Sequence, residues 1–149
     1  KAEAVYDAYA AAFPANKPVE VVCMANSART GLINSASVKY AQGAPVYVAW
    51  FGYKAPLFNG RLRAFHCADI CYWFRNTDEM YSHTGGGPEP RALSEKMSSA
   101  LLSFMRTGDP NCKELPEWPK WTPEEGAVMI FNTECEVRND PDRAIRELL

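Results

Sequence analysis

The stretch GAPVYVAWFG, residues 43–52, decides the fold class of this chain. Residues 44–51 are apolar throughout, and turn-forming glycines stand on both sides of them. A short continuous apolar run between turn residues is typical of a β-strand that is buried on both faces. Such strands belong to parallel sheets whose two faces are covered by helices. The stretch therefore predicts an α/β fold.

The segments around this strand supply the helices. Residues 28–43 have the pattern of a helix closed by Gly43, which would give an α-to-β step into the strand. Residues 91–108 form the clearest helix, with an apolar stripe at Leu93, Met97, Leu101 and Phe104. Further elements are expected as a helix up to Pro14, a short helix at 67–75, a surface excursion at 76–90, a strand hairpin at 127–132 and 134–140, and a terminal helix from Pro141; residues 15–27 are ambiguous.

This inventory leaves the sheet incomplete. A parallel strand buried on both faces needs a neighbour on each side, because its backbone groups must be paired. Beyond the strand at 44–51, the chain offers only a short hairpin. We therefore expect residues 1–149 to be a single segment of a larger sheet-containing domain. The chain begins at Lys1 and not at methionine, which fits a processed product or a piece of a longer protein.

Composition excludes two classes of partner. The net charge of −2 gives no electrostatic basis for binding nucleic acid. No apolar run approaches the roughly 18 residues that a membrane-spanning helix needs, and no signal peptide is visible.

The five cysteines, Cys23, Cys67, Cys71, Cys112 and Cys135, are too few and odd in number for a disulfide scaffold. They predict buried free thiols with at most one disulfide bridge. The alternative is a thiol or zinc role for His66, Cys67 and Cys71. Their spacing lacks the paired short intervals of strong zinc motifs.

The position of His66 in the sequence makes it the main candidate for a catalytic residue. It follows the strand at 44–51 through a loop of about 14 residues, longer than most such connections. Ligands of open α/β sheets bind outside the carboxyl ends of the strands, so a histidine there is a candidate catalytic base. Asp69, three residues on, is a candidate supporting acid that would hold the loop or the imidazole, or a plain helix-start aspartate. A packed His66 is the structural alternative, and His83 in a polar loop is a weaker candidate.

The nucleophile that such a base needs has no counterpart in this chain. The serine elbow of α/β-hydrolases reads G-x-S-x-G, because its sharp strand-to-helix turn tolerates only small neighbours. That motif is absent from the sequence. The acids that precede His66 are Glu3, Asp7 and Glu20, and none stands at a convincing strand end. On residues alone, the chain carries the last member of a Ser-acid-His triad and lacks the first two.

Four segments in order, GAPVYVAWF, RAFHCADICYWF, SFMRTGDPN and LPEWPKWTPEEGAVMIF, resemble the carboxyl-terminal part of type-B carboxylesterases. This family includes para-nitrobenzyl esterases, cholinesterases and neuroligins. The resemblance is clear from about Ala44 to the end and looser before it. It implies the carboxyl-terminal portion of an α/β-hydrolase fold, with an incomplete sheet and packing helices.

The resemblance also implies a role for His66 as the family's catalytic histidine, supported by Asp69. The family more often has glycine where this chain has Cys67 and glutamate where it has Asp69. The serine and the acid would lie in a missing N-terminal portion, so the chain alone should be inactive. The substrate would be a small-molecule carboxylic ester, and no metal or organic cofactor is implied. Phe51, Tyr53 and Phe58 would line the pocket or simply pack.

Two further expectations follow. A chain from the non-catalytic adhesion branch of the same fold would be a binding module, although the retained His66 argues against that alternative. An isolated segment with an open sheet edge should also associate with itself or aggregate.

Overall fold

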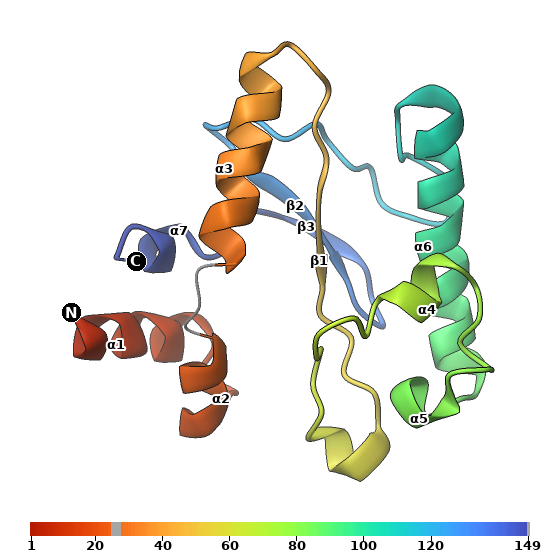
Figure 1. Ribbon diagram of the computed structural model, residues 1–149, viewed down its shortest axis with the longest axis horizontal. Coiled ribbons are helices and arrows are strands. Elements are labelled where there is room, and N and C mark those ends of the chain that lie inside the picture. The colour runs from red at the N-terminus through yellow and green to blue at the C-terminus, as the bar shows by residue number, and fades with distance from the viewer. Residues whose placement is uncertain (25–27, 149) are drawn as a thin grey trace.

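The computed structural model describes residues 1–24 and 28–148. Along the chain its elements are α1 (Ala2–Ala12), α2 (Pro18–Met24), α3 (Ala28–Ala41), β1 (Val48–Phe51), the 3-10 turn η1 (Leu57–Gly60), α4 (Ile70–Trp73), α5 (Tyr81–Thr84), α6 (Pro88–Thr107), β2 (Ala127–Phe131), β3 (Glu136–Asn139) and α7 (Arg143–Arg146). Figure 1 shows helices on both sides of a small sheet, with α6 and α4 on one side and α3 on the other. The α/β class is confirmed.

The sheet of the described residues has three strands in the order β1-β2-β3. β1 pairs with β2 in parallel, from Val48↔Val128 to Phe51↔Phe131. β2 and β3 are antiparallel, which confirms the predicted hairpin. Because β1 is an edge strand within the part of the chain that the structure describes, the sheet is partial, as the sequence predicts.

Alternation along β1 explains why its sequence is apolar throughout. Val48 and Trp50 pack on the α3 side with Trp121, whereas Ala49 and Phe51 pack on the side of α6. Successive side chains of a strand point to opposite faces, so a strand covered on both faces needs apolar residues at every position.

The strand is shorter than the sequence predicts. Residues 44–47 lie outside the ladder, although Trp121 N–H donates to the Val46 carbonyl oxygen at 2.7 Å. Pro45 lacks an N–H group and cannot contribute a donor to a ladder. Only Val48 of β1 is buried, while the next three residues are partly exposed. Full burial on both faces is therefore wrong for this edge strand.

Only the first half of the apolar stripe predicted for helix α6 is buried. Leu93 and Met97 are buried, but Leu101 is half-buried and Phe104 is 43% exposed. The carboxyl-terminal half of the helix therefore leaves apolar surface uncovered. Gly108 ends the helix with φ +77, as its position after the last turn predicts.

Three other segments refine the sequence interpretation. The ambiguous segment 15–27 contains α2, while residues 25–27 lie outside the described residues. The excursion at 76–90 contains α5, and its buried Thr84 hydroxyl donates to the Thr77 carbonyl oxygen at 3.0 Å. The terminal helix runs only over Arg143–Arg146, so Pro141 precedes it and does not begin it.

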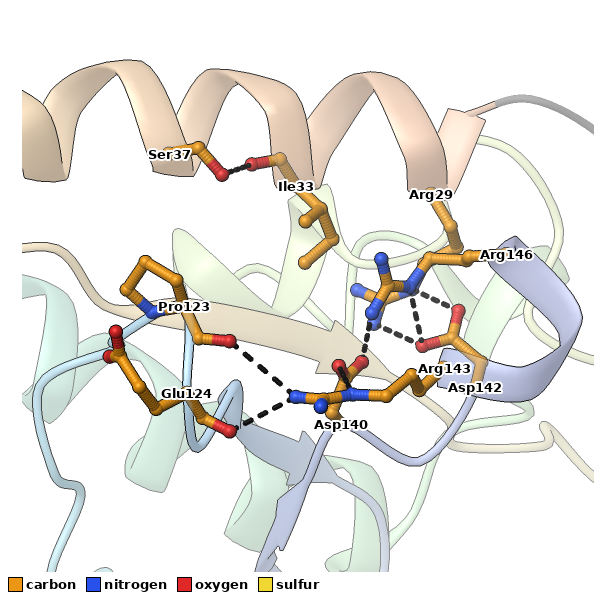
Figure 2. Close-up of polar contacts among 9 residues, drawn as sticks. All are labelled: Arg29, Ile33, Ser37, Pro123, Glu124, Asp140, Asp142, Arg143 and Arg146. Atoms are coloured by element: carbon orange, nitrogen blue, oxygen red, sulfur yellow. Dashed lines mark hydrogen bonds and ion pairs between the residues drawn. The ribbon is translucent and has the colours of Figure 1, made fainter.

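An arginine–aspartate cluster joins α3 to the end of the chain (Figure 2). Arg29 donates from Nε and Nη2 to the two carboxylate oxygens of Asp142, both at 2.8 Å. Its guanidinium also lies 4.6 Å from the centre of the Trp50 ring, a cation–π distance. Arg146 binds Asp140 and Asp142. The cluster therefore ties α3 and α7 to the sheet strand β1.

Asp142 is buried, and burial alone would raise the pKa of its carboxyl group. The hydrogen bonds and charge of Arg29, helped by Arg146, outweigh that effect. The pKa of Asp142 therefore lies below its usual value.

Candidate active site

The candidate site lies where the chain leaves the carboxyl end of β1. The loop from Gly52 runs through η1 to a turn at residues 66–69, and α4 follows directly. Figure 1 shows this loop extending beyond the ends of the strands and returning to α4. His66 stands in that turn and is exposed in the part of the chain that the structure describes.

Helix α4 fixes the turn against the carboxyl ends of both parallel strands. Tyr72 packs on Phe51, the last residue of β1, with ring centroids 5.0 Å apart. Trp73 meets Phe131, the last residue of β2, edge-on at 5.2 Å. Because α4 begins four residues after His66, these contacts hold the turn that carries His66 near the carboxyl ends of β1 and β2, the edge at which ligands of α/β proteins bind.

The backbone of the turn departs from ordinary conformations. Ala68 N–H donates to the Phe65 carbonyl oxygen at 3.0 Å, which closes a turn with His66 and Cys67 at its centre. Cys67 has φ +65, and a turn with a positive φ at its third residue is of the type that normally takes glycine. This conformation gives a physical reason for the glycine that the resemblance leads one to expect at position 67.

Asp69 binds the side chain of Trp73 and not the imidazole of His66. Its Oδ2 accepts a hydrogen bond from Trp73 Nε1 at 3.0 Å, four residues along the chain. No hydrogen bond joins Asp69 to the His66 ring among the described residues. Asp69 therefore secures the first turn of α4, and its support of His66 stays a prediction that would act through that helix.

The start of the loop is anchored to α6. Tyr53 is buried, and its hydroxyl donates to Glu89 Oε2 at 3.1 Å. Glu89 Oε1 accepts from the Thr133 hydroxyl at 2.7 Å, so one carboxylate joins the loop, α6 and the β2–β3 turn. Burial, and then the nearby Glu89 carboxylate, raise the pKa of Tyr53 to about 12.

The three aromatic residues that the sequence offers as pocket lining differ in their surroundings. Tyr53 packs in the core, Phe51 packs on Tyr72, and Phe58 is 71% exposed.

The end of the loop is anchored to α2. Arg63, three residues before His66, donates from Nε to Glu20 Oε1 at 2.7 Å and from Nη2 to Glu20 Oε2 at 2.5 Å. The hydrogen bond from Arg63, and then that from the Lys17 N–H group, lower the pKa of Glu20. On sequence alone, Glu20 is only a weak candidate for the triad acid, and nothing indicates its ion pair with Arg63. Its one local signal is the order Lys-Pro-x-Glu, with proline first in the helix and glutamate third.

The other candidate groups do not converge on His66. His83 lies beside Phe65 with ring centroids 5.4 Å apart, and its Nδ1 is 3.0 Å from the Ser82 hydroxyl. All five cysteines are free, with Cys23 and Cys67 exposed and Cys71 buried. The expectation of buried thiols therefore holds for Cys71 alone, since Cys112 and Cys135 are half-buried. In residues 1–24 and 28–148, no group of three or more His, Cys, Asp or Glu side chains could hold a metal ion.

None of the helices that the structure describes has the length and apolar content required to cross a bilayer.

Comparison with known proteins gives the family. The sequence model of the carboxylesterase family matches residues 16–145. The phenmedipham hydrolase of Pseudarthrobacter oxydans is 31% identical over 126 residues, covering 78% of this chain and 26% of the relative. The para-nitrobenzyl esterase of Bacillus subtilis (strain 168) is 31% identical over 110 residues, covering 71% of this chain and 22% of the relative.

Solved structures that resemble this chain are also esterases. An esterase of Clostridium hathewayi, described as hydrolysing aliphatic aromatic polyesters, superposes with a TM-score of 0.83 at 32% identity, covering 97% of this chain and 28% of that one. A carboxylesterase of Geobacillus stearothermophilus gives a TM-score of 0.68 at 35% identity, covering 79% of this chain and 24% of that one. The chain spans about a quarter of the length of the curated relatives that it matches. Its partial sheet fits a portion of their α/β-hydrolase fold, and the chain belongs to the carboxylesterase family.

Proposed function

We propose that this chain is the carboxyl-terminal segment of a serine carboxylesterase and that it carries the catalytic histidine, His66. The observation that supports this proposal most strongly is the position of His66. Its exposed imidazole stands in a turn held against the carboxyl ends of two parallel strands, in a chain of the carboxylesterase family.

The mechanism requires three groups that this sequence does not provide in recognisable form: a nucleophilic serine, an acid that orients the histidine, and the backbone donors of an oxyanion hole. A serine hydroxyl would attack the ester carbonyl carbon while His66 accepts its proton, and backbone N–H groups would hold the negative oxygen of the tetrahedral intermediate. His66 would then donate that proton to the leaving alcohol, and water would release the acid by the same steps in reverse order. We propose that the serine, the orienting acid and the oxyanion donors come from an N-terminal portion of the fold that would also pair with β1.

The substrate is proposed to be a small carboxylic ester. The relatives include a para-nitrobenzyl esterase and an esterase that hydrolyses aliphatic aromatic polyesters, so an aromatic ester is a suitable probe. The isolated chain should not hydrolyse para-nitrophenyl acetate at an enzymatic rate, because it lacks a serine elbow.

The coding sequence upstream of residue 1 tests the proposal. We expect a G-x-S-x-G motif there, with an acid between that motif and His66 in the chain order Ser, acid, His. An upstream sequence with the serine replaced would instead favour the binding module of the adhesion branch. Hydrolysis of the ester by the isolated chain at an enzymatic rate would contradict the proposal that this chain supplies only the histidine of the triad.

A further inference from the structure

The last stretch of the loop before His66 is held by an ion pair from another part of the chain. Arg63 lies three residues before His66, and Glu20 lies 43 residues earlier in α2. Both guanidinium–carboxylate hydrogen bonds are short, at 2.7 Å and 2.5 Å, and together they form a two-point fork. Such a fork restricts both the distance and the relative orientation of its partners, unlike a single-point contact.

Glu20 is itself fixed on the side of α2. The Lys17 N–H group donates to its Oε2 at 2.7 Å, which is half of a capping box at the start of this helix. The next residue, Val21, is 1% exposed and packs with Val5, Tyr9 and Ile145. The carboxylate therefore projects from a helix whose position is determined by its own apolar contacts.

The loop side needs such a tether. Arg63 has φ +52, Phe58 has φ +52 and Asn59 has φ +58, so three non-glycine residues of this loop occupy the left-handed region. Each such residue costs roughly 1 kcal/mol or more relative to an ordinary conformation. Strained residues of this kind persist where surrounding contacts determine the backbone, and they cluster at functional sites.

We propose that Glu20 and Arg63 are positioning residues, which set the place of the His66 turn by clamping its incoming backbone to α2. The proposal rests on the proposed role of His66 for its functional meaning. The clamp itself can be tested without any catalysis. It acts on the backbone before His66, so His66 is held between the Glu20–Arg63 fork before it and the Asp69–Trp73 contact after it.

The test uses backbone ¹⁵N relaxation of the 149-residue chain, at a concentration at which light scattering shows a monomer. Residues 61–67 should be as rigid as the helices in the unmodified chain, with order parameters of about 0.85. Glu20→Gln keeps the size of the side chain and removes its charge. Arg63→Asn removes the guanidinium fork and keeps a non-glycine side chain that tolerates the left-handed region, so backbone freedom is not increased by a glycine. Both variants should lower the order parameters of residues 61–67 below about 0.6.

A matched control removes an ion pair elsewhere. Asp78→Asn breaks the exposed contact of Arg91 Nε with Asp78, at 2.8 Å and 3.0 Å, and should leave residues 61–67 unchanged. In an ester-hydrolysing protein that contains this chain, Glu20→Gln should lower kcat about tenfold and leave KM unchanged, since only the placement of the base is altered.

Unchanged order parameters in both Glu20→Gln and Arg63→Asn would overturn the clamp. So would a loop that is already flexible in the unmodified chain. Because this readout involves no substrate, a rigid loop that loosens in the variants would support the clamp even if His66 proved to have no catalytic role.

Discussion

The buried pair of Arg29 and Asp142 offers the largest stability effect that the structure predicts for a single polar substitution. Their side chains are 16% and 3% exposed, and two hydrogen bonds of 2.8 Å join them. Asp142→Asn keeps one acceptor oxygen but places an amide donor against the guanidinium. Removing one partner of a buried pair costs about 3–5 kcal/mol. Because Arg29 retains some contact with solvent, we expect the lower end, about 3 kcal/mol.

Thermal and urea unfolding measure this effect. For a chain of this size, each 1 kcal/mol shifts Tm by about 2–4 °C, so Asp142→Asn should lower Tm by about 6–12 °C. The control Asp78→Asn breaks the pair with Arg91, whose side chains are 61% and 55% exposed, and should change stability by less than about 0.5 kcal/mol. Equal losses in the two variants would refute the reasoning that burial makes the Arg29 pair matter.

The same pair predicts a pH dependence with a definite sign. The pKa of Asp142 is lower in the folded chain than its usual value. Its contribution to stability is therefore fully present above the unfolded value of about 4 and is lost as pH falls through the folded value. Asp142→Asn should accordingly weaken the loss of stability in acid.

Three other predictions concern single residues and the sheet edge. Cys67→Gly should stabilise the chain by up to about 1 kcal/mol in urea unfolding, since φ +65 suits glycine and Cys67 is exposed; a loss of stability would contradict the turn geometry. Tyr72→Phe should be neutral or stabilising in the same assay, because the buried Tyr72 hydroxyl has no partner among the described residues; a loss above about 1 kcal/mol would reveal a missed hydrogen bond. Light scattering should detect self-association of the isolated chain, owing to the edge of β1 and the exposed Phe104 and Met105, and a monomer at high concentration would count against it.

The fold class was predictable because the run of eight consecutive apolar residues at 44–51, which contains β1, carries the signal of a buried strand. The hairpin and the long helix α6 were equally visible, since their patterns depend on local periodicity. The sequence also predicts that the sheet needs further strands, because a strand covered on both faces cannot stand at an edge without exposing its backbone. The extent of β1 was overestimated, since hydrophobicity does not report which residues lie next to a partner strand.

The candidate site was predictable only in part, because its contacts join distant segments. His66 could be singled out from its place after β1, and the exposure of its ring agrees with that choice. The fork from Glu20 to Arg63 spans 43 residues, and the link from Tyr53 to Glu89 spans 36. No periodicity or spacing encodes such pairs. The positive φ of Cys67 was equally hidden, since cysteine does not signal a left-handed turn as glycine does.

The central claim is that His66 acts as the proton-transferring base of an ester hydrolase. It is tested most directly by the rate of para-nitrophenyl acetate hydrolysis in the continuous protein that contains this chain, with and without His66→Gln. Loss of the base should lower kcat at least about 10⁴-fold while the protein remains folded, with His83→Gln as the matched control that keeps full activity. An active His66→Gln enzyme would contradict the account.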